Sequence, residues 1–310
     1  YSNGTLTVNP APLGISVTGT YSGSTTITPT SYSIAGLVNH ETLTPTSVTA
    51  NSSQVSDNGT NYVTSINTAS GTASLNNYKI TTNYNAVSGS AQNIANINQL
   101  NSVTWVGGSS GNWSAANNWL NGAIPTAANV ANVVIPTSSN VSYDISGLSA
   151  SVSITNNGSL SFFTNSSLSF ANNISGKGSV IKENFSALTL SGNNSYLGGT
   201  FLNGGTLIVS NSNALGSGQL SMADGTVLQA GTNNVTLSNN IAMTGSASIN
   251  APNGETFILA GLISNGSYAA SIKINASQND QSLGTVILSN ANNTFGSSQN
   301  FSTNIWLAFD

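Results

Sequence analysis

The chain has 310 residues, with four lysines, no arginine, eight Asp and Glu, a net charge of −4 and no cysteine. Attraction to nucleic acid or to an anionic membrane surface needs clustered Lys or Arg, so this composition argues against both as partners. No run approaches the ~20 consecutive apolar residues of a membrane-spanning helix, and we expect no direct membrane insertion. The absence of cysteine is typical of a protein that is secreted without forming disulfides.

The residues that meet water here are Asn, Ser, Thr and Gly. Charged residues make up 4% of the chain, whereas average globular chains spend about a quarter of their residues on them. Short polar residues suit turns and the outward faces of strands, while long helices prefer Ala, Leu, Glu, Lys and Arg. Hydrophobic residues reach 38% and gather in short runs, which a disordered chain lacks. The composition therefore predicts an ordered, all-β protein.

The first twelve residues contain a short strand-like run before a Pro-x-Pro break at Pro10 and Pro12. Such a break is a stiff, extended spacer, so we interpret residues 1–12 as the last strand of a preceding module plus a linker. Two interpretations of the strand remain open. It either completes the sheet of a neighbouring subunit as a donor strand, or it simply marks where the sequence begins. The strand consists of Thr5, Leu6, Thr7 and Val8.

Residues 13–90 alternate apolar and polar side chains, with Pro or Gly at intervals of about 8–12 residues. This pattern predicts a small antiparallel sandwich, an Ig-like or β-grasp-like module. Residues 91–102 are expected to be a linker.

From residue 103 the pattern changes to apolar, small, apolar triplets separated by Asn, Gly and Ser, such as Leu188–Leu190 and Leu207–Val209. Each triplet directs two side chains to one face and one to the other, as a short strand on the wall of a β-solenoid requires. Asn and Gly suit the tight corners, where left-handed backbone occurs. Residues 103–310 are therefore predicted to form a right-handed parallel β-helix.

An internal repeat supports stacking. The sequence LTLSGNNSYLGG near Leu188 returns as VILSNANNTFGS near Val286, so that Asn193 and Asn194 correspond to Asn292 and Asn293 at an offset of 99 residues.

Three tryptophans, Trp105, Trp113 and Trp119, fall close together at the start of the predicted β-helix. Flat aromatic rings pair with sugar faces, so they could form a carbohydrate-stacking surface, together with Trp306. Alternatively, they form a cap that plugs the open end of the helix core, since terminal coils must be shielded from water.

Residues that could carry catalysis or bind metal are sparse. His40 adjoins Glu41, but the chain has no second His and no Cys for a metal site or a triad. The carboxylates are far apart in sequence, although a β-helix could bring together the two that a glycosidase needs. Asp57-Asn58-Gly59 is the nearest approach to a calcium motif and is better explained as an Asn-Gly turn. We expect no enzyme, and no catalytic, metal or cofactor-binding residues.

The stretch LTLSGNNSYLGGTFLNGGTLIVSNSNALGSGQL, Leu188–Leu220, resembles the passenger-associated repeat of autotransporters and related secreted bacterial adhesins. Ile174–Lys182 is similar to the lead-in before that repeat, and Leu259–Lys273 to a degenerate second lead-in. Thr104–Pro136 is similar to the Trp-rich coil at the start of such β-helical regions.

The N-terminal part resembles the small YDG/MBG-like β modules of filamentous-haemagglutinin-like adhesins. YSNGTLTVNPAPL matches the junction between modules, Tyr21–Thr26 the YDGTT element, and Asn77–Ile80 the closing NYxI strand. Ser22 replaces the Asp of that family, so no role of the carboxylate carries over.

These resemblances imply a fragment of a large exported adhesin at the bacterial cell surface, an extracellular structural protein that mediates attachment or contact within a biofilm matrix. Its expected partners are a host or neighbouring cell surface, polysaccharide, or self, as a homo-oligomer or fibre. A self-assembling filament subunit, joined by β-strand or end-to-end β-helix contacts, is the first alternative. A β-helical polysaccharide-active enzyme is the second.

Overall fold

The computed structural model describes residues 9–81, 93–163, 165–252, 254–264, 271–274, 284–294 and 300–301. The chain divides into an N-terminal unit (Tyr1–Asn101, Asn121–Ala123 and Ala128–Val130) and a solenoid (Ser102–Leu120, Ile124–Ala127 and Ala131–Asp310). The helical segments among the described residues are single 3-10 turns: η1 Val55–Asp57, η2 Leu75–Asn77, η3 Ala116–Asn118 and η4 Leu120–Gly122. The predicted all-β class is therefore confirmed.

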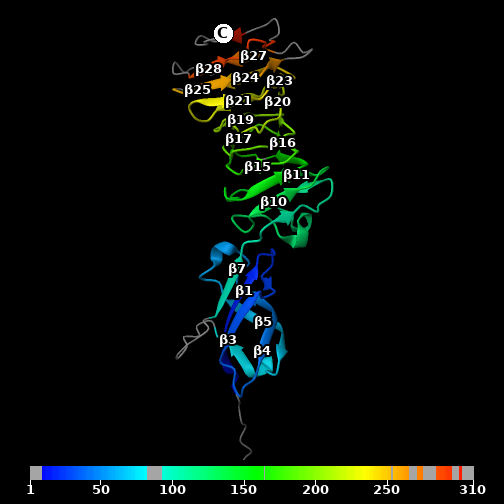
Figure 1. Ribbon diagram of the computed structural model, residues 1–310, viewed down its shortest axis with the longest axis vertical. Helices are drawn as coiled ribbons and strands as arrows, with labels where there is room; N and C mark the ends of the chain where they lie inside the picture. Colours follow the sequence, from blue (N-terminus) through cyan, green and yellow to red (C-terminus); the bar gives the residue numbers. More distant parts are fainter. Residues whose placement is uncertain are drawn as a thin grey trace, which may run out of the picture. The chain divides into compact units, whose positions relative to one another are not determined.

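The N-terminal unit has two sheets (Figure 1). The first contains β1 Ala11–Thr20, β3 Ser31–Ala35, β6 Tyr78–Ile80 and β7 Ile94–Asn98, and the second contains β2 Thr26–Ile27, β4 Leu43–Ala50 and β5 Val63–Gly71. The second sheet is antiparallel, but β1 pairs in parallel with both β6 and β7. The predicted antiparallel sandwich is wrong in this respect, because the chain crosses to the second sheet before it returns to lie beside β1.

Part of the expected linker is a strand. Within residues 91–102, β7 pairs with β1 from Ser16–Ile94 to Thr20–Asn98. Its side chains alternate between the core and the surface, with Ala95 and Ile97 buried. Burial of these two side chains makes the segment part of the N-terminal unit. At the other end, β1 already begins at Ala11, inside the segment interpreted as spacer.

Side-chain amides in the N-terminal unit hydrogen-bond to backbone groups of strands β5 and β7 and of a loop. Asn93 lies against Val63, with its Oδ1 accepting the Val63 N–H and its Nδ2 donating to the Val63 carbonyl, each at 3.0 Å. Asn58 makes the same pair of bonds to Ile97, and Asn61 to Ser52. An asparagine amide thus replaces a neighbouring peptide group, which satisfies the backbone without charge.

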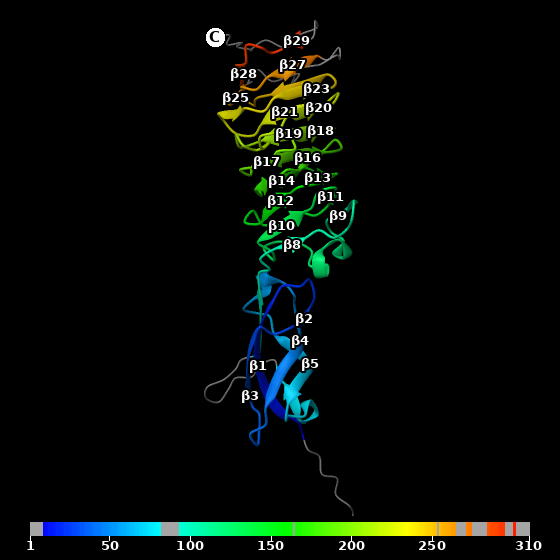
Figure 2. The same cartoon turned by 45° about the vertical axis from the view of Figure 1, so that its right-hand side comes forward.

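The solenoid confirms the predicted parallel β-helix, with about six turns. Its coils pass through three wall positions, and successive strands stack in parallel as rungs (Figures 1 and 2). The first wall contains β8 Val103–Thr104, β10 Asn132–Ile135, β12 Ser153–Asn156 and β15 Ile174–Ser175, then β22 Val235–Leu237, β25 Thr256–Leu259 and β28 Thr285–Leu288.

The second wall is one eight-stranded sheet, called sheet G below. It contains β9 Ser110–Asn112, β11 Asn140–Tyr143, β13 Ser159–Phe162, β16 Ser179–Lys182, β18 Thr200–Leu202, β20 Leu220–Met222, β23 Ile241–Met243 and β26 Ile263–Ser264. The third wall contains β14 Leu168–Phe170, β17 Ala187–Leu190, β19 Thr206–Val209, β21 Val227–Ala230, β24 Ala247–Asn250, β27 Ile272–Ile274 and β29 Asn300–Phe301.

Aligned inward side chains build the core of the solenoid. On sheet G, equivalent positions of successive coils form one buried column: Val141, Leu160, Val180, Thr200, Leu220, Ile241 and Ile263. Burial of apolar area contributes roughly 25 cal/mol per Å². Each coil therefore gains stability from contact with the coils on either side.

The two sequence repeats make the same hydrogen bond on different walls. Asn194 accepts the N–H of Ile174 in β15 at 2.7 Å, and Asn293 accepts the N–H of Ile263 in β26 at 2.8 Å. β15 belongs to the first wall and β26 to sheet G. The two similar sequences therefore form the same type of corner. The second copy is displaced by one wall around the solenoid relative to the first.

Candidate functional site

The tryptophans of the first coil lie together in the core. Trp119 packs edge to face against Trp105 at 5.2 Å and against Trp113 at 4.8 Å between ring centroids. Trp113 continues the contact to Tyr143 at 5.1 Å. All three indoles are at most 2% exposed, and each Nε1–H donates to a main-chain carbonyl, of Gly108, Pro125 or Trp113.

This burial bears on the two interpretations of Trp105, Trp113 and Trp119. A ring without an exposed face cannot stack on a sugar, whereas rings packed edge to face inside the first coil stabilise that end of the core by about 0.5–1.5 kcal/mol per pair beyond area burial. Trp306 and the expected donor strand (Thr5, Leu6, Thr7 and Val8) lie outside the described residues.

Three of the described carboxylates accept hydrogen bonds from residues of a neighbouring coil. Asp144 accepts from the N–H and Oγ of Ser114 at 2.8 and 2.6 Å, and Asp224 accepts the Ser246 N–H at 2.8 Å. Glu183 accepts from Asn203 at 3.0 Å. Within the described ranges, no group of three or more His, Cys, Asp or Glu could hold a metal ion.

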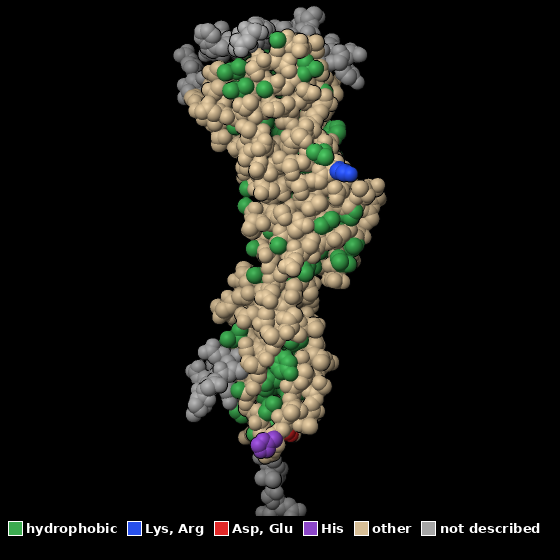
Figure 3. All heavy atoms as spheres, viewed as in Figure 1, with side chains coloured by type: hydrophobic (Ala, Val, Ile, Leu, Met, Phe, Trp, Pro, Cys, Tyr) green, Lys and Arg blue, Asp and Glu red, His purple; other side chains and the backbone are tan. Residues whose placement is uncertain are grey.

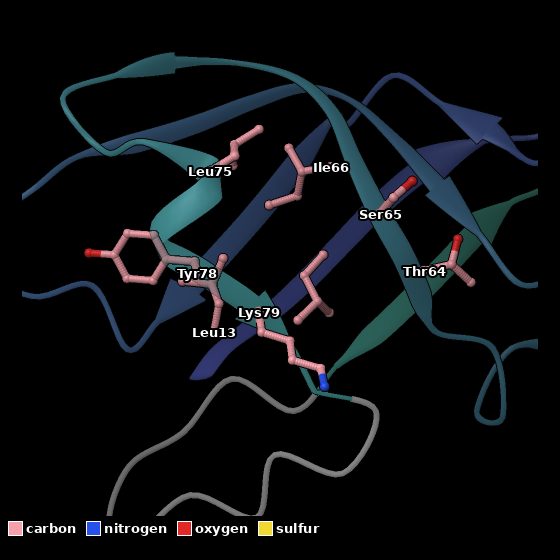
Figure 4. A pocket seen from close by; sticks show the side chains of 8 residues that line it. Leu13, Thr64, Ser65, Ile66, Leu75, Tyr78 and Lys79 are labelled. Atoms are coloured by element: carbon pink, nitrogen blue, oxygen red, sulfur yellow. The ribbon is translucent and has the colours of Figure 1, made fainter. Parts of the chain in front are cut away.

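A pocket of about 380 Å³ opens in the N-terminal unit beside β5 and β6 (Figure 4). Its lining is Leu13, Thr64, Ser65, Ile66, Leu75, Tyr78, Lys79 and Ile80. Tyr78 hydrogen-bonds Glu41 through its hydroxyl, which raises the pKa of the tyrosine. With a single cationic group and no carboxylate among the lining residues, the pocket offers apolar contact and lacks a pair of groups for acid–base chemistry.

Exposed apolar side chains concentrate on adjacent coils of the solenoid. Most of the viewed surface is neither charged nor hydrophobic (Figure 3), but Phe163, Leu197 and Phe201 are 58%, 58% and 41% exposed. Phe185, at the corner after β16, is 95% exposed. Clusters of exposed apolar residues mark contact surfaces, so this part of sheet G is the strongest candidate for a functional surface.

Lys182 occupies an inward position of the same region. Its rung lies between Phe162 and Leu202, and the residue is 1% exposed. The ammonium donates to the carbonyls of Glu183, Asn184 and Gly204. Burial lowers the pKa of Lys182, and the nearby Glu183 carboxylate opposes that shift.

Lys182 is also the first residue of a recognised repeat. Residues 182–209 match the family described as the passenger-associated-transport-repeat. This match confirms the passenger repeat expected from Leu188 onward and fits an autotransporter passenger domain, an exported part of a protein. No curated protein and no solved structure matches the chain significantly.

The matched repeat closes one coil. Its first strand, β17, pairs directly with its last, β19, from Ala187–Thr206 to Leu190–Val209. Between them, Tyr196 is fully buried and its hydroxyl bonds Thr200 at 2.6 Å. A Cβ on Gly198 would lie 2.5 Å from the Gly178 backbone. Tyr196 thus packs inside its own coil, and Gly198 allows the close approach of the preceding coil.

Sequence reasoning missed the exposed surface on sheet G. The signal lies in the alternation of GKGSVIKE, which directs Lys177, Ser179, Ile181 and Glu183 outward and Val180 and Lys182 inward. The apolar, small, apolar triplets mark the inward residues of each strand and carry no information on which outward residues are exposed.

No helix among the described residues is long and apolar enough to cross a membrane.

Proposed function

We propose that this chain is a segment of an extracellular adhesin at the bacterial cell surface, and that it acts by contact without catalysing a reaction. The observation that carries the proposal is the passenger repeat at residues 182–209, which builds one coil of a parallel β-solenoid and includes the exposed Phe185 and Phe201. An exported scaffold with an apolar surface is suited to attachment.

The mechanism is geometric. Stacked coils hold outward side chains in rows about 4.7–4.9 Å apart, so one wall presents a regular array to a cell surface, to a polysaccharide or to another copy. The sparsity of charge favours this, because like residues stack over like and a charged row would repel itself. Amide and hydroxyl groups instead supply hydrogen bonds.

The proposal is tested by display on a non-adherent bacterium, with the chain fused to a heterologous surface anchor. Cells that carry the chain should be retained on at least one of three surfaces: cultured host cells, immobilised neutral polysaccharide, or a lawn of the same displaying cells. Cells that display the anchor alone provide the control, with equal display checked by antibody labelling. Retention equal to that control on all three surfaces would overturn the adhesive function.

A further inference from the structure

The outward side chains of sheet G form a small grid around β16. Strand pairing places Ser161, Ile181 and Phe201 on successive coils. Along β16 and its flanks the outward residues are Lys177, Ser179, Ile181 and Glu183, and along β18 and its flanks they are Leu197, Phe201 and Asn203. The coil before contributes Phe163, next to Glu183, whose N–H donates to the Phe162 carbonyl.

Opposite charges border this grid. Lys177 is exposed before the start of β16 and Glu183 follows its end, in a chain with four basic and eight acidic residues in all. Between them, the centre of the grid is apolar, with Ile181 partly exposed and Phe201 41% exposed. The surface therefore has a positive edge, an apolar middle and a negative edge.

We propose that two copies of this chain pair through sheet G, with their solenoid axes parallel and related by a two-fold axis along the same direction. Such a rotation reverses the strand direction of the partner. It therefore brings Lys177 against the partner's Glu183 and Glu183 against the partner's Lys177. The antiparallel arrangement would oppose lysine to lysine and glutamate to glutamate, which is unfavourable.

The apolar centre suits the same orientation. Phe201 is the exposed residue of β18, and Gly199, two residues earlier and just before the strand, is buried and carries no side chain. Reversal of the strand direction puts each Phe201 opposite the partner's Gly199, where the absence of a side chain leaves space for the ring. A two-fold interface is self-complementary in this way, with each patch meeting its own copy.

The biological role of this pairing rests on the proposed function, because contact between copies is one of the ways in which a surface adhesin acts. Pairing itself is a property of the folded chain. It can therefore be measured on purified protein, separately from the retention of displaying cells.

Sedimentation velocity of the purified chain over a concentration series tests the proposal. We expect a reversible dimer that is weakened on the order of tenfold by K177E and by E183K, because each creates like charges across the interface. The double variant K177E/E183K should recover the wild-type dissociation constant, since it restores opposite charges in the same geometry. The matched control is K273E, which changes the charge equally on an exposed residue of the third wall.

Each alternative result is informative. A monomer at every concentration, or singly changed variants that dimerise like wild type, would overturn the pairing, as would a double variant that stays weakened. Open-ended fibres would contradict the closed two-fold arrangement. Circular dichroism of all variants checks that the fold is intact. Retention of displaying cells on polysaccharide or host cells without pairing would leave the proposed function standing and remove this inference alone.

Discussion

Asn194 holds Ile174 by its amide: the Asn194 Oδ1 accepts the Ile174 N–H at 2.7 Å. The Nδ2 of the same side chain donates to the carbonyl of Ala214 at 2.6 Å. Because Ile174 and Ala214 lie 20 residues before and after Asn194, one amide links three coils at a corner of the first wall. The side chain is 5% exposed, so water cannot readily replace it.

Asn194→Ala should therefore destabilise the solenoid by about 1–3 kcal/mol, the cost of leaving buried peptide groups without partners. Urea unfolding measures this difference. Asn213→Ala is the matched control, because the Asn213 amide bonds another exposed asparagine, Asn193, and its loss should cost no more than about 0.5 kcal/mol. Equal effects of the two substitutions would contradict the structural role of the buried amide.

Trp119→Ala should destabilise the first coil by about 3–5 kcal/mol, because it removes a buried ring that contacts both Trp105 and Trp113. Hydrogen exchange should then quicken locally, around β8 to β11. The neighbouring Leu120, which is 49% exposed, supplies the control, and Leu120→Ala should leave exchange near the wild-type rate. Faster exchange throughout the solenoid, without a local maximum, would argue against a cap.

Because of Lys182, we expect the free energy of unfolding to increase at alkaline pH. Its pKa is lowered in the folded chain, so the unfolded chain binds more protons between that lowered value and about 10.5. The free energy of unfolding should increase with pH through this window. Lys182→Met should remove the increase, whereas Lys177→Met should retain it.

The effect of Lys182 on the free energy of unfolding should be measured below about pH 9.5. Burial raises the pKa of Tyr143 to about 12 and also raises that of Tyr196. These tyrosines lose their proton first in the unfolded chain, near pH 10, so they lower the free energy of unfolding above that pH. Chemical unfolding at steps from pH 7 to 9.5 separates the two effects, and identical slopes for wild type and Lys182→Met would refute the prediction.

The solenoid could be predicted because its signal is local. The triplets Leu188–Leu190 and Leu207–Val209 alternate at the period of a strand, and they recur at the length of a coil. Wall position was not predictable, since Asn194 and Asn293 occupy similar sequences on different walls. Corner length decides which wall a strand joins, and corners vary from coil to coil.

The N-terminal unit and the candidate surface show where sequence reasoning stops. Period-two alternation is the same in parallel and antiparallel strands, so it could not show that β7 lies parallel to β1. The contact surface depends on which outward residues meet across coils. Phe201 meets Ile181 only through the register of β16 and β18, a spacing of 20 residues that no local pattern contains. The handedness of the coil and the likeness of the N-terminal unit to haemagglutinin modules stay predictions.

The decisive test of adhesion through sheet G is the retention of displaying cells under flow, compared between wild type and a sheet G variant. The variant replaces Phe163, Ile181 and Phe201 with Ser, and the control replaces Ile208 and Val227, outward residues of the third wall, in the same way. At equal display, retention of the sheet G variant should fall to the level of the anchor alone, while the control should be retained like wild type. Undiminished retention of the sheet G variant would contradict adhesion through sheet G.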